Sequence, residues 1–314
     1  MTDHDELQHG LVVRFEGGFY MVQSGGESLL CTLVKRLRRG VRSATNPLAV
    51  GDTVGFRDIG GEQGVIERID ERRNELVRTA PGRDALKHVL AANLDLLLVV
   101  TALRSPPPNL ARIDRFLLIA EQAEIPPAIV VTKLDEGTVD EADALFAPYP
   151  TIGYPVLLTS ATTGYGLPAL RALLTDKISA VVGSSGVGKS TLLNAVQPGL
   201  QLRAGELGER TGKGRHTTTV ADLIPLIEGG YVADTPGLRG IEPFDLDPEL
   251  LDEYFPEMRP FRDSCRFQPC SHIHEPGCAV RAAVEAGAIA RSRYDSYVKL
   301  YDEARQNARP AWAR

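Results

Sequence analysis

From residue 94 onward, short apolar runs alternate with stretches in which apolar residues recur every three to four positions. The runs are typical of buried strands, and the recurring pattern is typical of amphipathic helices. We predict strands at residues 94–102, 127–131, 155–158, 178–182 and 230–233. We predict helices at residues 110–123, 140–146, 167–175 and 190–196. Strands and helices that alternate in this way indicate a doubly wound, mainly parallel α/β sheet with its ligand at the carboxyl ends of the strands.

The first 75 residues show a different pattern, in which strand-like segments follow one another without a helix. They lie at residues 11–15, 19–23, 28–34, 52–56 and 64–69, and several are separated by Gly-Gly turns. Five such strands suit a small Greek-key β-barrel of the OB-fold type. These barrels bind nucleic acid on one face and along their loops, although a purely structural barrel would show the same pattern.

Residues 183–190 follow the pattern G-x-x-x-x-G-K-[ST], which forms a phosphate-binding loop when a strand precedes it and a helix follows. The backbone N–H groups of such a loop wrap the phosphates of a nucleotide. Lys189 would contact the β- and γ-phosphates, and Ser190 would ligate Mg²⁺. The nucleotide-binding residues predicted here are Gly183, Ser184, Ser185, Gly186, Val187, Gly188, Lys189, Ser190 and Thr191.

Two guanine-recognition motifs lie ahead of this loop, whereas in ordinary GTPases they follow it. Thr132, Lys133, Leu134 and Asp135 close one predicted strand, and Ser160 and Ala161 close the next. Alone, the first motif would also fit a loop before a helix that Asp135 caps. Beside the other motifs it indicates a guanine site, because Asp135 can accept hydrogen bonds from the guanine N1–H and amine, a pair that adenine lacks. We therefore expect GTP and GDP as ligands.

An Asp-x-x-Gly motif, from Asp234 to Gly237, follows the last predicted strand, and no [NT]-K-x-D motif occurs after it. In GTPases this motif reaches Mg²⁺ through water and meets the γ-phosphate. The order of the motifs therefore predicts a circularly permuted P-loop GTPase. Leu238 stands just after the motif, where Ras-like enzymes place a water-orienting glutamine, so unassisted hydrolysis should be slow.

Three of the four cysteines fall within fourteen residues, with a histidine between them: Cys265, Cys270, His272 and Cys278. An odd number of clustered thiols without a secretion signal argues against a disulfide framework. Three cysteines and one histidine make a complete tetrahedral zinc set with no open position, so we expect one structural Zn²⁺ per chain. By position alone, His274 is an alternative to His272.

The 314 residues are 43% hydrophobic and 24% charged, which is ordinary for two or three globular domains. The formal net charge of −6 argues against general affinity for nucleic acid. Residues 1–10 lack the apolar core of a signal peptide, and the apolar run at residues 94–103 is too short to span a bilayer. We therefore expect a cytoplasmic protein without membrane contact. Cys31, outside the cluster, is expected to be a small buried apolar residue.

Residues 28–50 contain five basic side chains and no acidic one: Lys35, Arg36, Arg38, Arg39 and Arg42. Few aromatic residues lie on the barrel strands, so base stacking is poorly supported. We therefore expect this loop to bind the phosphates of folded RNA, with a solvated surface loop as the alternative.

Helical patterns at residues 248–253 and 279–307 flank the cysteine cluster. Together with the barrel and the nucleotide motifs, they predict three domains. These are an OB-fold RNA-binding domain at residues 1–78, a circularly permuted GTPase domain at residues 79–244, and a zinc-binding helical domain at residues 245–314.

Three stretches carry a resemblance to one known family: the permuted nucleotide motifs, Gly-Arg-His-Thr-Thr-Thr at residues 214–219, and C-x4-C-x-H-x5-C. Over nearly the whole chain, the sequence resembles the ribosome small subunit-dependent GTPase A family. The resemblance implies a role in late maturation of the 30S ribosomal subunit, with that subunit stimulating hydrolysis of GTP to GDP. It implies the subunit and its 16S rRNA as partners, and His272 as the zinc ligand. We expect a monomer.

The resemblance also bears on the catalytic residues. It favours His216 for positioning the attacking water and Thr217 or Thr218 for binding Mg²⁺, of which we assign Thr218; with Lys189 these form the predicted catalytic set. A surface histidine without a catalytic role is the alternative for His216. Thr132 departs from the asparagine that GTPases generally carry there. A different class of function, a nucleotide-gated RNA-binding module in which hydrolysis is incidental, fits the same motifs.

Overall fold

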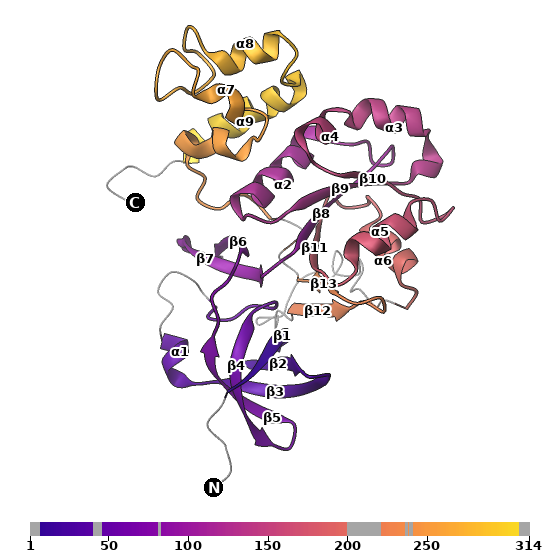
Figure 1. Ribbon diagram of the computed structural model, residues 1–314, viewed down its shortest axis with the longest axis vertical. Coiled ribbons are helices and arrows are strands. Elements are labelled where there is room, and N and C mark those ends of the chain that lie inside the picture. The colour runs from indigo at the N-terminus through magenta and orange to yellow at the C-terminus, as the bar shows by residue number, and fades with distance from the viewer. Residues whose placement is uncertain are drawn as a thin grey trace, which may run out of the picture.

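The computed structural model of the chain describes residues 7–39, 46–80, 83–199, 221–235, 238 and 241–307. Three parts follow one another along the long axis in Figure 1. A barrel lies at one end, an α/β sheet with its helices in the middle, and a helical module at the other end. The predicted order of fold types is confirmed. The exact domain boundaries stay a prediction.

The barrel consists of five strands: β1 (Gln8–Glu16), β2 (Phe19–Ser24), β3 (Glu27–Leu33), β4 (Thr53–Gly60) and β5 (Gln63–Ile69). Their order is β1-β2-β3-β5-β4, and an antiparallel β1–β4 pairing closes the barrel. Alternate side chains fill the interior, among them Val12, Val22 and Phe56. Cys31 is fully buried in this core, as expected from its apolar surroundings. The predicted barrel is therefore confirmed.

One expectation for the barrel was wrong. The first part of the basic segment is not a loop, because residues Lys35–Arg39 form the short helix α1 directly after β3. Leu37 packs against the barrel core from this helix. This apolar contact, which no local sequence pattern indicates, helps to stabilise one turn of helix in a basic segment.

The central sheet has the order β10-β9-β8-β11-β13-β12. Its strands are β8 (Leu96–Ala102), β9 (Pro127–Thr132), β10 (Val156–Leu158), β11 (Ile178–Val182), β12 (Ala221–Pro225) and β13 (Tyr231–Asp234). The first five in this order are parallel, and β12 is antiparallel to β13. All seven residues of β8 are buried, as expected for the centre of a parallel sheet.

Helices cover both faces of this sheet (Figure 1). The helices α2 (Leu110–Gln122), α3 (Val139–Phe146) and α4 (Pro148–Ile152) pack on one face. The helices α5 (Leu167–Leu174) and α6 (Lys189–Val196) pack on the other. The predicted doubly wound sheet is confirmed, whereas α4, β12 and the 3-10 helix η1 (Leu134–Glu136) had not been expected.

A two-stranded hairpin of β6 (Glu75–Ala80) and β7 (Arg83–Ala92) lies between the barrel and the central sheet. It had not been predicted, because polar residues such as Arg78 and Lys87 interrupt its apolar pattern. Leu76 and Leu90 nevertheless lie in the same core as α2. The proposed boundary between residues 78 and 79 falls inside β6.

The barrel and the central sheet are joined by backbone hydrogen bonds. The strand β1 pairs with β12, with Arg14 opposite Asp222 and Phe15 opposite Ala221, so eleven strands form one continuous sheet. The Arg14 guanidinium forms an ion pair with Asp222 across this junction. The barrel is therefore attached to β12, the outermost strand of the central α/β sheet, which follows residues 214–219 in the chain.

The C-terminal module contains η4 (Pro248–Tyr254), a 3-10 helix, and the helices α7 (Arg259–Arg262), α8 (Ala279–Glu285) and α9 (Arg291–Asn307). The helical pattern predicted over residues 279–307 forms two helices, with a break after α8 where Gly287 adopts a φ of 77°. Phe255, Met258 and Tyr297 form the centre of its core, to which α2 contributes Leu118. Among the described residues, no helix is long and apolar enough to cross a membrane.

Candidate nucleotide and metal sites

The phosphate-binding loop lies between β11 and α6, as its motif predicts. Gly183 adopts a φ of 147°, and a Cβ there would lie 2.2 Å from the carbonyl oxygen of Val100. Gly186 and Gly188 also have positive φ values, of 78° and 91°. A side chain at these positions would be strained or would collide with β8. The glycines therefore give the loop its shape and keep its backbone N–H groups open to a ligand.

Lys189 begins α6, and its Nζ donates hydrogen bonds to the carbonyl oxygens of Gly183 and Ser184, both at 2.7 Å. The ammonium group is thus placed inside the curve of the loop. Val187 is buried against the core on the α5 and α6 face, while Ser190 is half-buried and Thr191 is exposed. A helix N-terminus and a lysine that meet at one loop favour a bound anion.

The two guanine-recognition motifs lie side by side at the ends of β9 and β10. The Leu134 N–H donates to the carbonyl oxygen of Thr159 at 3.1 Å. The Ser160 hydroxyl donates to Oδ1 of Asp135, which is the largest cause that lowers the pKa of this carboxyl group. Asp135 is therefore held as a carboxylate in one orientation, with acceptor capacity left for a ligand.

Thr132 connects the guanine motif to the phosphate loop. Its buried hydroxyl lies within hydrogen-bond distance of the carbonyl oxygens of Thr101, at 3.1 Å, and of Val187. The aliphatic part of Lys133 passes near Gly188, and its Nζ donates to the carbonyl oxygen of Ser105. Threonine at position 132 thus still contacts the phosphate loop, although it departs from the usual asparagine.

The Asp-x-x-Gly motif begins beside the phosphate loop. Asp234 ends β13 one residue after Ala233, which is paired with Ala180 of the neighbouring β11. Leu238 is 4% exposed and packs in the core shared with α2, so its side chain faces away from solvent. Gly237, His216, Thr217 and Thr218 lie outside the described residues.

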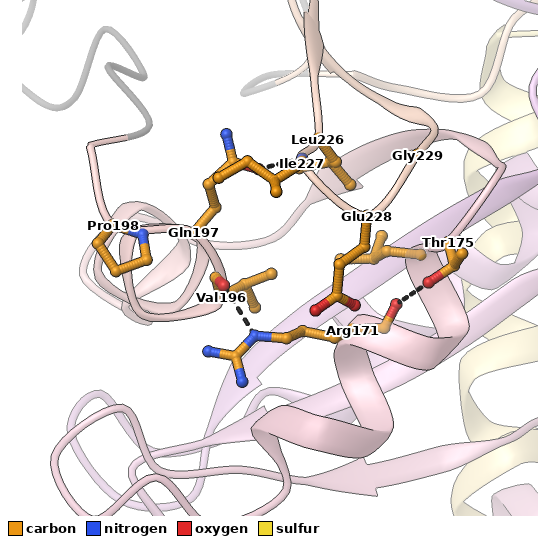
Figure 2. Close-up of a pocket in the computed structure, with 10 residues that line it drawn as sticks. Arg171, Thr175, Val196, Gln197, Pro198, Leu226, Ile227, Glu228 and Gly229 are labelled. Carbon is orange, nitrogen blue, oxygen red and sulfur yellow. Dashed lines mark hydrogen bonds between the residues drawn. The ribbon is translucent and has the colours of Figure 1, made fainter.

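An arginine fixes the opposite end of the phosphate-loop helix. Figure 2 shows Arg171 reaching from α5 to the last turn of α6, beside a small cavity of about 110 Å³. Its Nε donates to the carbonyl oxygen of Val196 at 2.8 Å, and its Nη2 donates to that of Ala195 at 2.9 Å. Arg171 therefore forms hydrogen bonds with carbonyl groups that the end of a helix leaves without partners. No sequence motif predicted this role.

The four predicted metal ligands form one cluster: Cys265, Cys270, His272 and Cys278, with all ligand atoms within 4.8 Å of one another. The Sγ atoms of Cys265 and Cys278 are 3.8 Å apart, and Nδ1 of His272 lies 3.5 and 3.4 Å from them. A tetrahedral zinc with Zn–S of about 2.3 Å and Zn–N of about 2.0 to 2.1 Å requires separations of about 3.8 and 3.5 Å. The geometry of the donors therefore fits Zn²⁺.

Groups around the cluster orient its donors. Nε2 of His272 faces Oδ2 of Asp252 at 3.2 Å, which leaves Nδ1 turned toward the thiols. The backbone N–H of Ala279 points at Sγ of Cys265 at 3.3 Å, which suits a thiolate. His274 is exposed and does not belong to the cluster found among the described residues. The sequence had not pointed to Asp252, because its spacing from His272 follows no motif.

The basic segment is only partly described. Lys35 and Arg36 are exposed on α1, and Nη2 of Arg36 donates to the carbonyl oxygen of Glu67 at 2.9 Å. The side chains of Arg38 and Arg39, and the whole of Arg42, lie outside the described residues. The expectation that these residues bind RNA stays a prediction.

Comparison with known proteins agrees with this geometry. The family model described as RsgA GTPase matches residues 69–244. The small ribosomal subunit biogenesis GTPase RsgA of Moorella thermoacetica is 44% identical over 294 residues, which are 94% of this chain and 96% of that relative. The protein of the same name from Gemmatimonas aurantiaca is also 44% identical, over 297 residues, with the same coverage of 94% and 96%.

Two solved structures share the whole fold. YjeQ from Thermotoga maritima has a TM-score of 0.79 and 37% identity, covering 96% of this chain and 99% of that one. YloQ, described as a circularly permuted GTPase, has a TM-score of 0.75 and 32% identity, covering 99% of each chain. A family match over more than half of the chain, supported by full-length relatives, leaves one conclusion: this chain belongs to the RsgA GTPase family.

Proposed function

We propose that this protein is a GTPase that hydrolyses GTP to GDP and acts in biogenesis of the small ribosomal subunit. The observation that carries the proposal is the contact between the two permuted halves of the site. Thr132, at the guanine motif, touches the phosphate loop at Val187, and Ser160 orients Asp135 beside it. A guanine contact and a phosphate contact thus share one edge of the sheet, as nucleotide binding requires.

Within this site, Lys189 binds the β- and γ-phosphates, and Ser190 with Thr218 would hold the Mg²⁺ that accompanies GTP. The metal ion would neutralise charge on the phosphates during phosphoryl transfer. Because Leu238 is buried, it cannot orient water, and His216 is proposed for that task. Asp234 and Gly237 would contact Mg²⁺ through water and the γ-phosphate, respectively.

The curated relatives are named for biogenesis of the small ribosomal subunit, which supports the 30S subunit as partner. We extend this to contact with its 16S rRNA through Lys35, Arg36, Arg38, Arg39 and Arg42. A cytoplasmic location and a monomeric state complete the proposal. The buried Leu238 also favours a second candidate, in which GTP only gates RNA binding and hydrolysis is incidental.

A titration of GTP turnover with purified 30S subunits tests the proposal. We expect slow phosphate release from the protein alone and a saturable increase as subunits are added, because the chain lacks a water-orienting glutamine. If subunits bind in a GTP-dependent way but leave turnover unchanged, the second candidate function, RNA binding gated by GTP, is supported instead. If neither binding nor turnover responds, the ribosomal role is wrong.

Charge reversal at Arg36, Arg38 and Arg39 to glutamate should weaken 30S binding about tenfold or more. The association constant should also depend less on salt. The magnitude of the slope of log K against log salt should fall by about 2 to 3, because three phosphate contacts are lost. Turnover without subunits should stay at the wild-type level, since the barrel contributes no described residue to the nucleotide site.

Arg68→Glu is the matched control, because it reverses an exposed charge on β5 of the same barrel. It should retain 30S binding within about twofold. Full stimulation of the triple variant at physiological salt would instead support the structural barrel.

Removal of the proposed zinc should unfold the C-terminal module and leave the α/β core folded. The module is small, and its four proposed ligands lie between α7 and α8, where the chain has no helix or strand. We therefore expect the metal to supply much of the stability of the module. Cys270→Ser should lose bound zinc in metal analysis and lose helical circular dichroism. His274→Ala should keep one zinc per chain; if it lost zinc as Cys270→Ser does, the ligand set would be wrong.

A further inference from the structure

Arg293 of α9 is a fully buried cation between the helical module and the α/β domain. It is 1% exposed, and its Nη1 donates to Oδ1 of Asp114 on α2 at 2.8 Å. Its Nε and Nη2 donate to the two carboxylate oxygens of Glu257, at 2.7 and 3.2 Å. Three aromatic rings surround the guanidinium, and that of Phe255 is the nearest, with its centroid 4.7 Å away.

The cation and its two carboxylates depend on one another. Asp114 and Glu257 have side chains that are 0% and 7% exposed, and both pair with the Arg293 guanidinium, as buried acidic side chains generally require. Burial acts to lower the pKa of Arg293, but the two carboxylates outweigh it and raise this pKa, so the arginine stays charged. Asp114 also accepts from the Tyr149 hydroxyl at 3.0 Å, while its Oδ2 is buried without a partner among the described residues.

Two tyrosines of α9, within about one helical turn of Arg293, form hydrogen bonds with the proposed zinc loop. The Tyr294 hydroxyl donates to the carbonyl oxygen of His272 at 2.8 Å, and the Tyr297 hydroxyl donates to that of Ser271 at 2.9 Å. One helix therefore contacts the metal-ligand loop and α2 within a few residues. Figure 1 shows the helical module placed over α2, and Leu118 of α2 is part of the core of that module.

The first turn of α2 lies across a cavity from the phosphate loop. Asn109 caps this end, accepting a hydrogen bond from the Arg112 N–H at 3.0 Å. The first turn of α2, including Ile113, lines a cavity of about 210 Å³ together with Ser184, Ser185 and Val187. Asp114, which Arg293 holds, is the next residue after Ile113. A displacement of α2 would therefore move one wall of the cavity that the phosphate loop also lines.

We propose that Arg293 is a positioning residue for the nucleotide site, which holds α2 through Asp114 and so ties the helical module to the phosphate loop. The proposal rests on the proposed function, because it assigns Arg293 a part in GTP and GDP binding. Within the described part of the chain, the hydrogen bonds and ring contacts of Arg293 go to no predicted nucleotide-binding residue. Its effect passes through the first two turns of α2, where Asp114 meets Arg293 and the adjacent Ile113 lines the cavity beside the phosphate loop.

Arg293→Met in the full-length protein tests this role, because it keeps the length of the side chain and removes the charge. We expect GDP affinity, measured with a fluorescent GDP, to fall about tenfold, within the range known for residues that couple two sites. Amide hydrogen exchange should increase in residues 110–122 and 183–190. Arg291→Met is the matched control, since Arg291 lies on the same helix with an exposed ion pair to Asp295, and it should change neither quantity.

Zinc content shows whether the module has stayed folded. If Arg293→Met keeps its zinc and binds GDP within about twofold of wild type, the positioning role is wrong. If the variant unfolds because two carboxylates are left buried without a cation, a triple variant removes those charges as well: Asp114→Asn, Glu257→Gln and Arg293→Met.

The triple variant should fold and still bind GDP about tenfold more weakly, because methionine cannot hold position 114. Wild-type GDP affinity in the folded triple variant would overturn the proposal. GDP affinity does not depend on hydrolysis or on ribosomes. If wild-type protein bound GDP but showed no turnover with 30S subunits, the proposed function would fail while the role of Arg293 would still be tested.

Discussion

Lys189→Ala is expected to lower GTP turnover by about 1,000-fold or more, both with and without 30S subunits. Lys189 is the cation inside the curve of the phosphate loop, with its Nζ bonded to the Gly183 and Ser184 carbonyl oxygens. In the nucleotide complex this charge would stabilise the phosphate oxygens on which negative charge develops, and alanine offers no substitute. Phosphate release under saturating GTP measures the effect.

Stability distinguishes a lost contact from a lost fold. Lys189 is half-buried at the start of α6, where alanine is a good helix former, so the thermal midpoint should change little. Lys299→Ala, at an exposed position on α9, is the control for a general effect of lysine removal. Near-normal turnover by a folded Lys189→Ala protein would show that this loop is not the catalytic site.

Asp135→Asn should weaken GDP and GTP binding by about 2 to 4 kcal/mol, through loss of charge-assisted hydrogen bonds to guanine. Asparagine keeps one oxygen that can accept from Ser160, so the local structure should persist. Its amide N–H₂ would, however, face the guanine N1–H or amine, and two donors would then oppose each other. Isothermal titration with GDP measures the loss.

The same substitution should improve binding of xanthine nucleotides. Xanthine carries a carbonyl oxygen where guanine carries its amine, and the asparagine amide can donate to that oxygen. A gain for XDP together with a loss for GDP would assign Asp135 to the base rather than to folding. Asp143→Asn, at an exposed position on α3, should leave both affinities unchanged. Equal losses for GDP and XDP would contradict the assignment.

The permuted order of the motifs has a structural consequence at both ends of the α/β domain. The edge strand β12 pairs with β1 of the barrel, and the segment after β13 leads through Leu238 into the helical module. The strand β12 follows residues 214–219, and β13 ends with Asp234, the first residue of the motif that runs to Gly237; both of these segments are expected to lie near the γ-phosphate. The two outer modules are thus attached close to the elements that would respond to GTP hydrolysis.

Much of the candidate site could be predicted from the sequence, because each motif is a local requirement. The glycines at 183, 186 and 188 are needed by the backbone of one short loop, and their positive φ values agree with that need. The strands β8, β9 and β11 were predicted for a similar reason, since burial on both faces leaves a continuous apolar run. The spacing of the three cysteines likewise predicted a cluster whose thiols and His272 lie together.

The tertiary structure decided whatever depends on residues far apart in the chain. Thr132 meets Val187 across 55 residues, Arg14 meets Asp222 across 208, and Arg293 meets Asp114 across 179. The hairpin of β6 and β7 and the short helix α1 also escaped prediction, because contacts with distant cores stabilise segments whose own patterns are weak. A local pattern indicates which face of a helix or strand is apolar. It does not indicate which other element packs on that face, because this depends on residues far away in the sequence.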